Sequence, residues 1–329
     1  MRAVVVGAGT WGTAFAALLR DRGHDVALAG RDSEQARAIA DTGRNPRYAQ
    51  QADLRGVVPT TIAEAPVEEA DVVVAALPSR VFSEVVGGLP GSAPVLSLTK
   101  GLDPATGERL SRSISRRPVA VLSGPNMAEE VLAGLPTAPE EVLAGLPTAA
   151  VIASEDAALA VELQHAINSP VFRVYVNADV LGVELCAAAK NVIALAAGGV
   201  DGLGLGDNAK ASLITRGLAE MRRLGEAAGA EPETFAGMAG MGDLIVTCWH
   251  PSGRNRRAGE LIARGRTPEQ AVVEIGQTVE GLTTAPALRD LSHRLGIELP
   301  ITEGVCTVLA GQDLTELVST LMRREPTEE

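Results

Sequence analysis

The chain has 329 residues, enough for two domains of ordinary size and a substantial hydrophobic core. Its 29 basic and 41 acidic residues give a net charge of −12, which disfavours general attraction to nucleic acid or to an anionic membrane. We expect no secretory leader and no later apolar stretch of about 20 residues. We therefore expect a cytoplasmic protein without membrane insertion. The three cysteines and four histidines follow no metal-site spacing, so no metal is expected.

The first 180 residues alternate short apolar runs with amphipathic stretches such as Trp11–Arg20 and Ser79–Val86. This alternation predicts an α/β fold, a Rossmann-type doubly wound and mostly parallel sheet with helices on both faces. The expected strands are Arg2–Val6, Asp25–Ala29, Asp71–Ala76, Pro94–Leu98, Pro118–Leu122, Ala149–Ala153 and Val171–Val176.

From about Asp179 the pattern changes to long helical segments, which predict a second, all-α domain. We expect a dinucleotide-binding domain over residues 1–179 and a helical substrate-binding and catalytic domain over residues 180–329. The expected helices are Val180–Ala197, Asn208–Ala228, Arg256–Arg264, Thr284–Leu295 and Leu314–Arg323.

A tandem repeat begins at Glu129, where EEVLAGLPTAP is followed at once by EEVLAGLPTAA. Gly134 and Pro136 stop a helix within the first copy, so both copies cannot form the same helix, turn and strand entry. Two copies are also too few to build a stacked solenoid. We expect one copy to be an insertion that forms an exposed helical turn or loop outside the active cleft.

Gly7, Gly9 and Gly12 have Gly-x-Gly-x-x-Gly spacing directly after the first strand and at the start of a helix. The first glycine permits the tight turn, the second lets a pyrophosphate approach the backbone, and the third lets the helix pack against the strand. In this context the motif predicts dinucleotide binding. NAD and NADP both remain open, because Asp32 could hold a ribose diol while Arg31 could meet a 2′-phosphate. Alternatively, Asp32 caps the next helix and Arg31 is solvated.

Only three of the 29 basic residues are lysines, namely Lys100, Lys190 and Lys210. Arginine cannot replace lysine where a proton must leave or a compact ammonium must fit. Lys190 is the only charged residue between Glu184 and Asp201, on a helix that is apolar on nearly every side. Desolvation there would make its proton labile and suit a general acid or base, although a snorkelling or structurally paired lysine is the alternative.

Asp243 is isolated in the same way, as the sole charge between Glu233 and Arg254. Two buried opposite charges are costly when unpaired, so we expect Lys190 and Asp243 to approach each other. A plain helix cap is the alternative for Asp243.

Two further features suit an anionic ligand. The segment SGRNRRAGE concentrates donors at the start of a helix, and a guanidinium fork matches phosphate oxygens, although a solvated basic cluster is the alternative. Lys100 follows a strand at the carboxyl edge of the predicted sheet, where ligands bind in such folds. The donors in the segment are Arg254, Asn255, Arg256 and Arg257.

The chain resembles the bacterial NAD(P)-dependent glycerol-3-phosphate dehydrogenases along nearly its whole length. The resemblance implies reversible hydride transfer between NAD or NADP and C2 of the substrate, mainly reducing dihydroxyacetone phosphate to sn-glycerol 3-phosphate for phospholipid synthesis. The oligomeric state is left open, a homodimer included. The matching blocks are GAGTWGTAFA, LTKGLDPATG, SGPNMAEEV, AAAKNVIALAAGGVDGLGLGDNAKASLITRGLAEM, AGMGDLIVTC, GRNRRAGE and VEGLTTAPAL.

The resemblance also implies roles for residues. Lys190 matches the proton acceptor and donor, Asp243 an acid of the substrate site, and Lys100 a lysine that contacts both cofactor and substrate. Gly253 departs from the pattern, since the family usually has serine there and here Ser252 stands one place earlier. Besides the three glycines, the matching cofactor positions are Thr10, Trp11, Arg31, Tyr48, Ala128, Arg254 and Glu280. The remaining substrate positions are Gly124, Asn126, Arg254 and Asn255.

Three other functions are weighed against this one. A related β-hydroxyacid or ketopantoate-type dehydrogenase would share the nucleotide fold and an essential lysine but would take a carboxylate substrate. A non-catalytic nicotinamide sensor would keep the glycines without needing Lys190 and Asp243. A purely structural protein would leave the clustered motifs unexplained.

Overall fold

The computed structural model describes residues 1–134 and 146–315, and the chain divides into two compact units. Unit 1 comprises Met1–Asp103 and Glu108–Glu184, and unit 2 comprises Pro104–Gly107 and the chain from Leu185 onward. The loop or turn expected from the repeat lies outside the described residues, as does most of the expected helix Leu314–Arg323.

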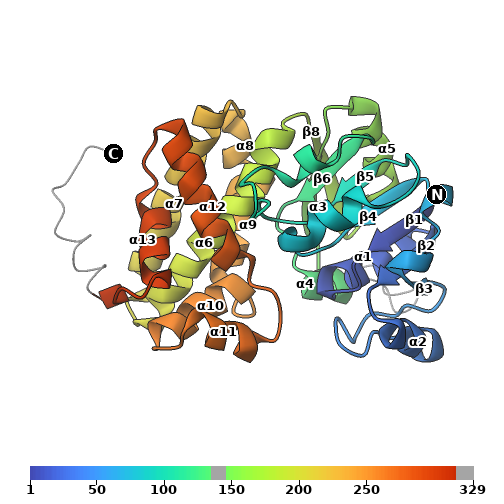
Figure 1. The fold of residues 1–329 in the computed structure, drawn as a ribbon, viewed down its shortest axis with the longest axis horizontal. Coiled ribbons are helices and arrows are strands. Elements are labelled where there is room, and N and C mark those ends of the chain that lie inside the picture. Colours follow the sequence, from blue (N-terminus) through green and yellow to red (C-terminus); the bar gives the residue numbers. More distant parts are fainter. Residues whose placement is uncertain (135–145, 316–329) are drawn as a thin grey trace. The chain divides into compact units, whose positions relative to one another are not determined.

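Unit 1 contains an eight-stranded sheet in the order β3-β2-β1-β4-β5-β6-β7-β8 (Figure 1). All neighbouring strands pair in parallel except β6 and β7, which are antiparallel, so the expected mostly parallel, Rossmann-type sheet is confirmed. The strands are β1 Arg2–Val6, β2 Asp25–Gly30, β3 Val58–Thr61, β4 Val72–Ala75, β5 Val95–Ser97, β6 Val119–Ser123, β7 Thr148–Ala153 and β8 Phe172–Asn177.

The sheet is covered on both faces because successive side chains of a strand point to opposite sides. In β1, Val5 joins one hydrophobic cluster with Phe15 of α1, while Val4 and Val6 join another with Phe82 of α3. Both faces of the sheet are therefore shielded from solvent, which explains why the strands are uninterrupted apolar runs. The helices of this unit are α1 Thr10–Asp21, α2 Ser33–Thr42, α3 Ser79–Gly87, α4 Ala128–Gly134 and α5 Ala157–Ile167.

Strand β3 was not expected from the sequence. Its sequence, VPTT, contains a proline and no apolar run, and it lies at the edge of the sheet, where it pairs only with β2. An edge strand tolerates proline because one side of its backbone has no partner strand. Short edge strands of this kind carry too weak a pattern for periodicity to find.

Unit 2 is helical throughout its described residues, in agreement with the expected all-α second domain. Two of its helices pack backbone against backbone, because a Cβ on Gly198 of α6 or on Gly259 of α10 would overlap a carbonyl oxygen of the other helix. The helices are α6 Val180–Gly202, which begins in unit 1, α7 Gly206–Ala228, α8 Pro232–Ala236, α9 Asp243–Trp249, α10 Arg254–Ala263, α11 Pro268–Ile275, α12 Glu280–Leu295 and α13 Pro300–Leu309.

Helix α6 corrects one expectation, that no long apolar stretch occurs in the chain. Its 23 residues have the length and composition of a membrane-spanning helix, with a mean hydropathy of 1.7 over the most apolar window. That window is 89% buried inside the structure. The composition is therefore that of a central core helix, apolar on every side because protein surrounds it.

Candidate active site

Each glycine of the turn between β1 and α1 meets a different structural requirement. Gly7 has a φ of +116°, and a Cβ there would overlap the carbonyl oxygen of Ala76. A Cβ on Gly12 would overlap the carbonyl oxygen of Gly7, so this residue brings helix and strand together. A Cβ on Gly9 would meet nothing within 4 Å, and no side chain caps the start of α1 there. Open space beside uncapped helix amides fits a pyrophosphate.

Two buried amides that the sequence did not point to hold this turn in place. Asn45 donates through Nδ2 to the carbonyl oxygen of Ala8 at 3.1 Å and to Thr13 Oγ1 at 2.8 Å. Gln35 donates to the same carbonyl at 3.1 Å and to Asn45 Oδ1 at 3.0 Å. Asn45 Oδ1 also accepts from the backbone N–H of Tyr48, which ties the segment of that predicted cofactor residue to the turn. Such contacts join residues about 30 positions apart, so no local spacing reveals them.

The end of β2 bears on cofactor choice. Asp32 is the N-cap of α2, with Oδ1 accepting from the backbone N–H groups of Glu34 and Gln35. Its Oδ2 lies 2.8 Å from Arg47 Nη1. These hydrogen bonds, together with Arg47, lower the pKa of Asp32 below its ordinary value. Asp32 therefore has the capping role that was the alternative to diol binding, whereas Arg31 is exposed.

Trp11 and Thr10 occupy the first turn of α1, beside the glycines. The Trp11 ring packs edge-on against Phe15, with centroids 5.7 Å apart. Its Nε1 is buried and has no hydrogen-bond partner among the described residues. A buried indole N–H normally has a partner, so a ligand acceptor would complete this position.

Lys100, Gly124 and Asn126 come together near the carboxyl ends of β5 and β6. Lys100 Nζ lies 3.3 Å from both the carbonyl oxygen of Gly124 and Asn126 Oδ1. The Nδ2 of Asn126 is buried without a partner in the part of the chain that the structure describes, and Ala128 begins α4 two residues later. A cation beside an unpaired amide donor can bind an oxygen-rich ligand. This cluster lies in unit 1.

In unit 2, Lys190 and Asp243 meet, as expected from their isolation in the sequence. Lys190 Nζ lies 2.5 Å from Asp243 Oδ1 and 2.8 Å from Thr247 Oγ1, while Thr247 Oγ1 lies 3.2 Å from the same carboxylate oxygen. The side chains of Lys190 and Asp243 are only 5% and 2% exposed. Asp243 is the first residue of α9 and directly follows the π-helical segment Met238–Gly242. Thr247 was missed, although its position four residues after Asp243 on the same helix face could have revealed it.

Asn255 of α10 is buried and joins three helices. Its Nδ2 donates to Asn191 Oδ1 of α6 at 2.9 Å, and its Oδ1 accepts from the backbone N–H of Gly281 of α12 at 2.9 Å. Because Asn191 is the residue after Lys190, this contact ties the start of α10 to the turn of α6 that carries the lysine. These two bonds use one of the two Nδ2 hydrogens, so Asn255 can donate the other to a ligand.

Arg254 opens α10, is exposed, and donates through Nη1 to the carbonyl oxygen of Thr278 at 2.9 Å. The protein atoms around the guanidinium lower the pKa of Arg254, and the carboxylate of Glu280, at the start of α12, opposes that shift. The one bond to Thr278 leaves most of the five N–H donors of the guanidinium for a ligand.

The expectation of four donors for one phosphate needs correction. Arg256 is turned inward to Asp201 and Glu260, so it belongs to the framework of unit 2, whereas Arg257 is exposed. The hydroxyl of Ser252 does not take the place of the serine that the family usually has at position 253, because its Oγ lies 2.9 Å from His250 Nδ1. Gly253 remains the N-cap of α10 without a side-chain hydrogen bond.

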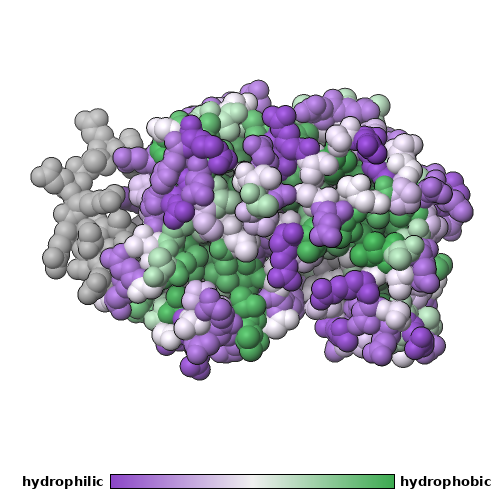
Figure 2. All heavy atoms as spheres, viewed as in Figure 1, coloured by the Kyte–Doolittle hydropathy of each residue, from purple (hydrophilic) through white to green (hydrophobic). Residues whose placement is uncertain are grey.

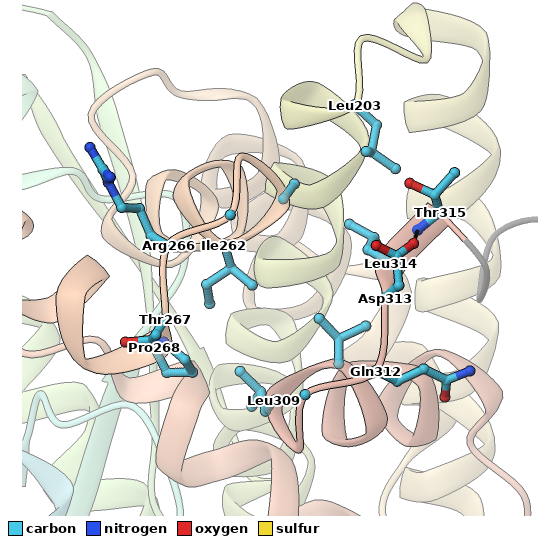
Figure 3. Close-up of a pocket in the computed structure, with 14 residues that line it drawn as sticks. Leu203, Ile262, Arg266, Thr267, Pro268, Leu309, Gln312, Asp313, Leu314 and Thr315 are labelled. Atoms are coloured by element: carbon cyan, nitrogen blue, oxygen red, sulfur yellow. Dashed lines mark hydrogen bonds between the residues drawn. The ribbon is translucent and has the colours of Figure 1, made fainter.

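A cavity of about 320 Å³ lies in another part of unit 2, beside the hydrophobic surface over α10 and α11 (Figures 2 and 3). None of the predicted site residues lines it. Leu203, Ile262 and Leu309 give it an apolar floor, with Arg266, Gln312 and Asp313 at its edge. It is therefore not the candidate active site.

Comparison with known proteins gives consistent results for both units. Family models described as the N-terminus and the C-terminus of NAD-dependent glycerol-3-phosphate dehydrogenase match residues 2–160 and 179–319. Proteins named glycerol-3-phosphate dehydrogenase (NAD(P)+) from Moorella thermoacetica and from a Parafrankia species are 43% and 45% identical to the chain. The alignments cover 99% of this chain and 96% and 98% of those proteins.

Among solved structures, a glycerol-3-phosphate dehydrogenase from Coxiella burnetii is similar at a TM-score of 0.90 and 34% identity, covering 98% of this chain and 99% of that one. A ketopantoate reductase from Ralstonia eutropha is similar at a TM-score of 0.57 and 18% identity, covering 98% of this chain and 100% of that one. The second likeness concerns the fold alone.

Proposed function

The chain belongs to the NAD-dependent glycerol-3-phosphate dehydrogenase family, and from that premise we propose that Lys190 is its proton donor and acceptor. It is an NAD(P)-dependent oxidoreductase that interconverts dihydroxyacetone phosphate and sn-glycerol 3-phosphate, a reaction that fits phospholipid synthesis. The full-length relatives favour this function over a carboxylate-reducing dehydrogenase and over a nicotinamide sensor.

We propose that residues 1–179 hold the nucleotide, which supplies or accepts the hydride when bound. The support is the open space at Gly9, the uncapped amides of α1 and the unpartnered Nε1 of Trp11. The amides and the positive end of the α1 dipole would bind the pyrophosphate. Arg31, Tyr48, Ala128, Arg254 and Glu280 complete the proposed cofactor set.

Arg254, with Asn255, is proposed to hold the phosphate of the substrate. Its exposed guanidinium has one bond to the protein, at the carbonyl of Thr278, and can present a pair of N–H groups to two phosphate oxygens. Lys100, Gly124 and Asn126 are also proposed to contact the substrate, because an ammonium and a buried amide donor suit its oxygens.

Lys190 is proposed to give a proton to the carbonyl oxygen at C2 during reduction and to take it back during oxidation. Asp243 stabilises the ammonium in surroundings that would otherwise favour neutral lysine. Thr247 accepts a hydrogen bond from Lys190 and so directs the ammonium. The observation that carries the proposal is the buried pair of Lys190 and Asp243, since taking two charges out of water is costly and titratable groups held in this way cluster at active sites.

Replacing Lys190 with arginine tests this role. The variant keeps the positive charge but changes the shape of the group and holds its proton too tightly to donate it. General acid–base catalysis contributes about 10²- to 10⁴-fold, so we expect kcat to fall by at least 10²-fold while NADPH still binds, as followed by nucleotide fluorescence. Substantial turnover of Lys190→Arg would remove the lysine from this role. If the unaltered protein reduced 2-oxo carboxylates faster than dihydroxyacetone phosphate, the assignment of the substrate would be wrong.

A further inference from the structure

The third lysine of the chain, Lys210, has no part in the reaction described so far. It lies in α7, is buried, and its Nζ is 2.8 Å from Asp201 Oδ2 at the end of α6. The same ammonium sits 4.9 Å from the ring centroid of Trp249, the last residue of α9. The ammonium thus lies between a carboxylate and an aromatic face, both of which stabilise a positive charge.

Asp201 Oδ2 is shared, because it also accepts from Arg256 Nη1. Arg256 in turn donates to two backbone carbonyls of the turn between α9 and α10, from Nε to His250 at 3.2 Å and from Nη2 to Pro251 at 3.3 Å. Its Nη2 also lies 3.2 Å from Glu260. We call Asp201, Lys210, Arg256 and Glu260 the anchor cluster. It holds two positive and two negative charges, and Glu260 also pairs with Arg264, at 2.6 Å.

The turn held by the anchor cluster separates the two groups that the reaction needs. Before it, α9 carries Asp243 and Thr247, which contact Lys190. After it, α10 begins with Arg254 and Asn255. Gly198 of α6 packs against the backbone of Arg256 so closely that no side chain fits there. The start of α10 is therefore fixed against the helix that also carries Lys190.

We propose that Asp201, Lys210 and Arg256 are positioning residues that set the phosphate end of the substrate site relative to the ammonium of Lys190. This inference rests on the proposed function, since it requires Arg254 to bind the substrate phosphate. Without the Asp201 carboxylate, Lys210 and Arg256 lose their shared counter-ion and repel each other. Arg256 is then free to leave the carbonyls of His250 and Pro251, and the turn that presents Arg254 loosens.

Replacing Asp201 with asparagine is the direct test, because the two side chains have nearly the same shape. We expect the KM for dihydroxyacetone phosphate to rise at least tenfold, and the inhibition constant of inorganic phosphate to rise by a similar factor. We expect kcat/KM for phosphate-free dihydroxyacetone to change less than twofold, because that substrate does not use Arg254. Asp290→Asn removes an exposed carboxylate in the same unit, paired with Arg289, and should leave all three values unchanged.

Conservative variants keep the test decisive if Asp201→Asn is too unstable to assay. Arg256→Lys keeps a charge opposite Asp201 but has no planar fork to reach both carbonyls, so it should show the same selective rise in KM. Lys210→Arg should be milder than Lys210→Met, since it restores the ion pair. Equal losses on dihydroxyacetone and its phosphate, or an unchanged phosphate inhibition constant, would overturn the proposal. Arg254→Ala tests the underlying function separately, because it removes the phosphate ligand and leaves the anchor cluster intact.

Discussion

Replacing Lys190 with methionine would leave the Asp243 carboxylate buried without its counter-ion. The pair is 2.5 Å apart and only 5% and 2% exposed, so water can hydrate the remaining charge very little. Removing one partner of a buried ion pair costs about 3 to 5 kcal/mol of unfolding free energy. Thr247 still donates to Asp243, at 3.2 Å in the present structure, which places the expected loss at about 3 kcal/mol.

Urea unfolding at neutral pH measures this loss. The chain has two tryptophans, and in a Trp11→Phe background the fluorescence of Trp249 reports on unit 2 alone. The double variant Lys190→Met with Asp243→Leu leaves no charge at this site. Its unfolding free energy should lie within about 1 kcal/mol of that of the protein with both residues unaltered.

The exposed pair of Arg222 and Glu226, with side chains 61% and 44% exposed, is the matched control, and its loss should cost less than about 1 kcal/mol. If Lys190→Met costs no more than Arg222→Met, or if the double variant is as unstable as the single one, the pair is not the desolvated couple that the mechanism requires.

Three further predictions concern other parts of the chain. Burial raises the pKa of Glu220 from 4.5 to about 7, so the folded protein holds a proton that the unfolded chain loses between these pH values. Unfolding free energy should therefore fall by about 3 kcal/mol from pH 4.5 to pH 7, and Glu220→Gln should abolish this slope in urea titrations. Arg31→Ala should lower kcat/KM about 10- to 100-fold more for NADPH than for NADH, since a guanidinium bond to a 2′-phosphate is charge-assisted. Deleting residues 135–145 restores a single repeat copy, with Gly134 again followed by Leu-Pro, and should leave melting temperature and turnover nearly unchanged.

For each of these three predictions, a specific result would contradict the reasoning. An unaltered pH slope in Glu220→Gln would mean that the carboxylate is already ionised near pH 5. Equal losses for both nucleotides in Arg31→Ala would indicate stacking on adenine or no contact with the 2′-phosphate. A large fall in melting temperature on deletion would show that the extra 11 residues stabilise the fold.

The sequence predicted those features whose physical cause is local. The continuous apolar runs of β1 and β2 predict strands that are buried on both faces, and the spacing of Gly7, Gly9 and Gly12 predicts the turn after β1. The meeting of Lys190 and Asp243 could also be predicted, because the cost of burying an unpaired charge depends little on where the partner lies in the chain. The structure supplied what depends on distant contacts, such as the bracing of the glycine turn by Asn45. It also decided between the alternatives that the sequence left open for Asp32, which caps α2.

Arg254 and Arg256 show most clearly why composition alone could not assign the phosphate site. Both arginines lie in the first turn of α10, and both were counted among the donors for one anion. On a helix, however, residues two apart project about 200° from each other, so they cannot serve the same ligand. Arg254 is exposed, whereas Arg256 faces Asp201 and the carbonyls of the preceding turn. The orientation of Arg256 depends on Asp201, 55 residues earlier, and the carboxylate of that residue is neutralised in turn by Lys210. In our proposal this basic cluster therefore divides into Arg254, which binds the ligand, and Arg256, which holds Arg254 in place, and only the partners of each side chain distinguish the two.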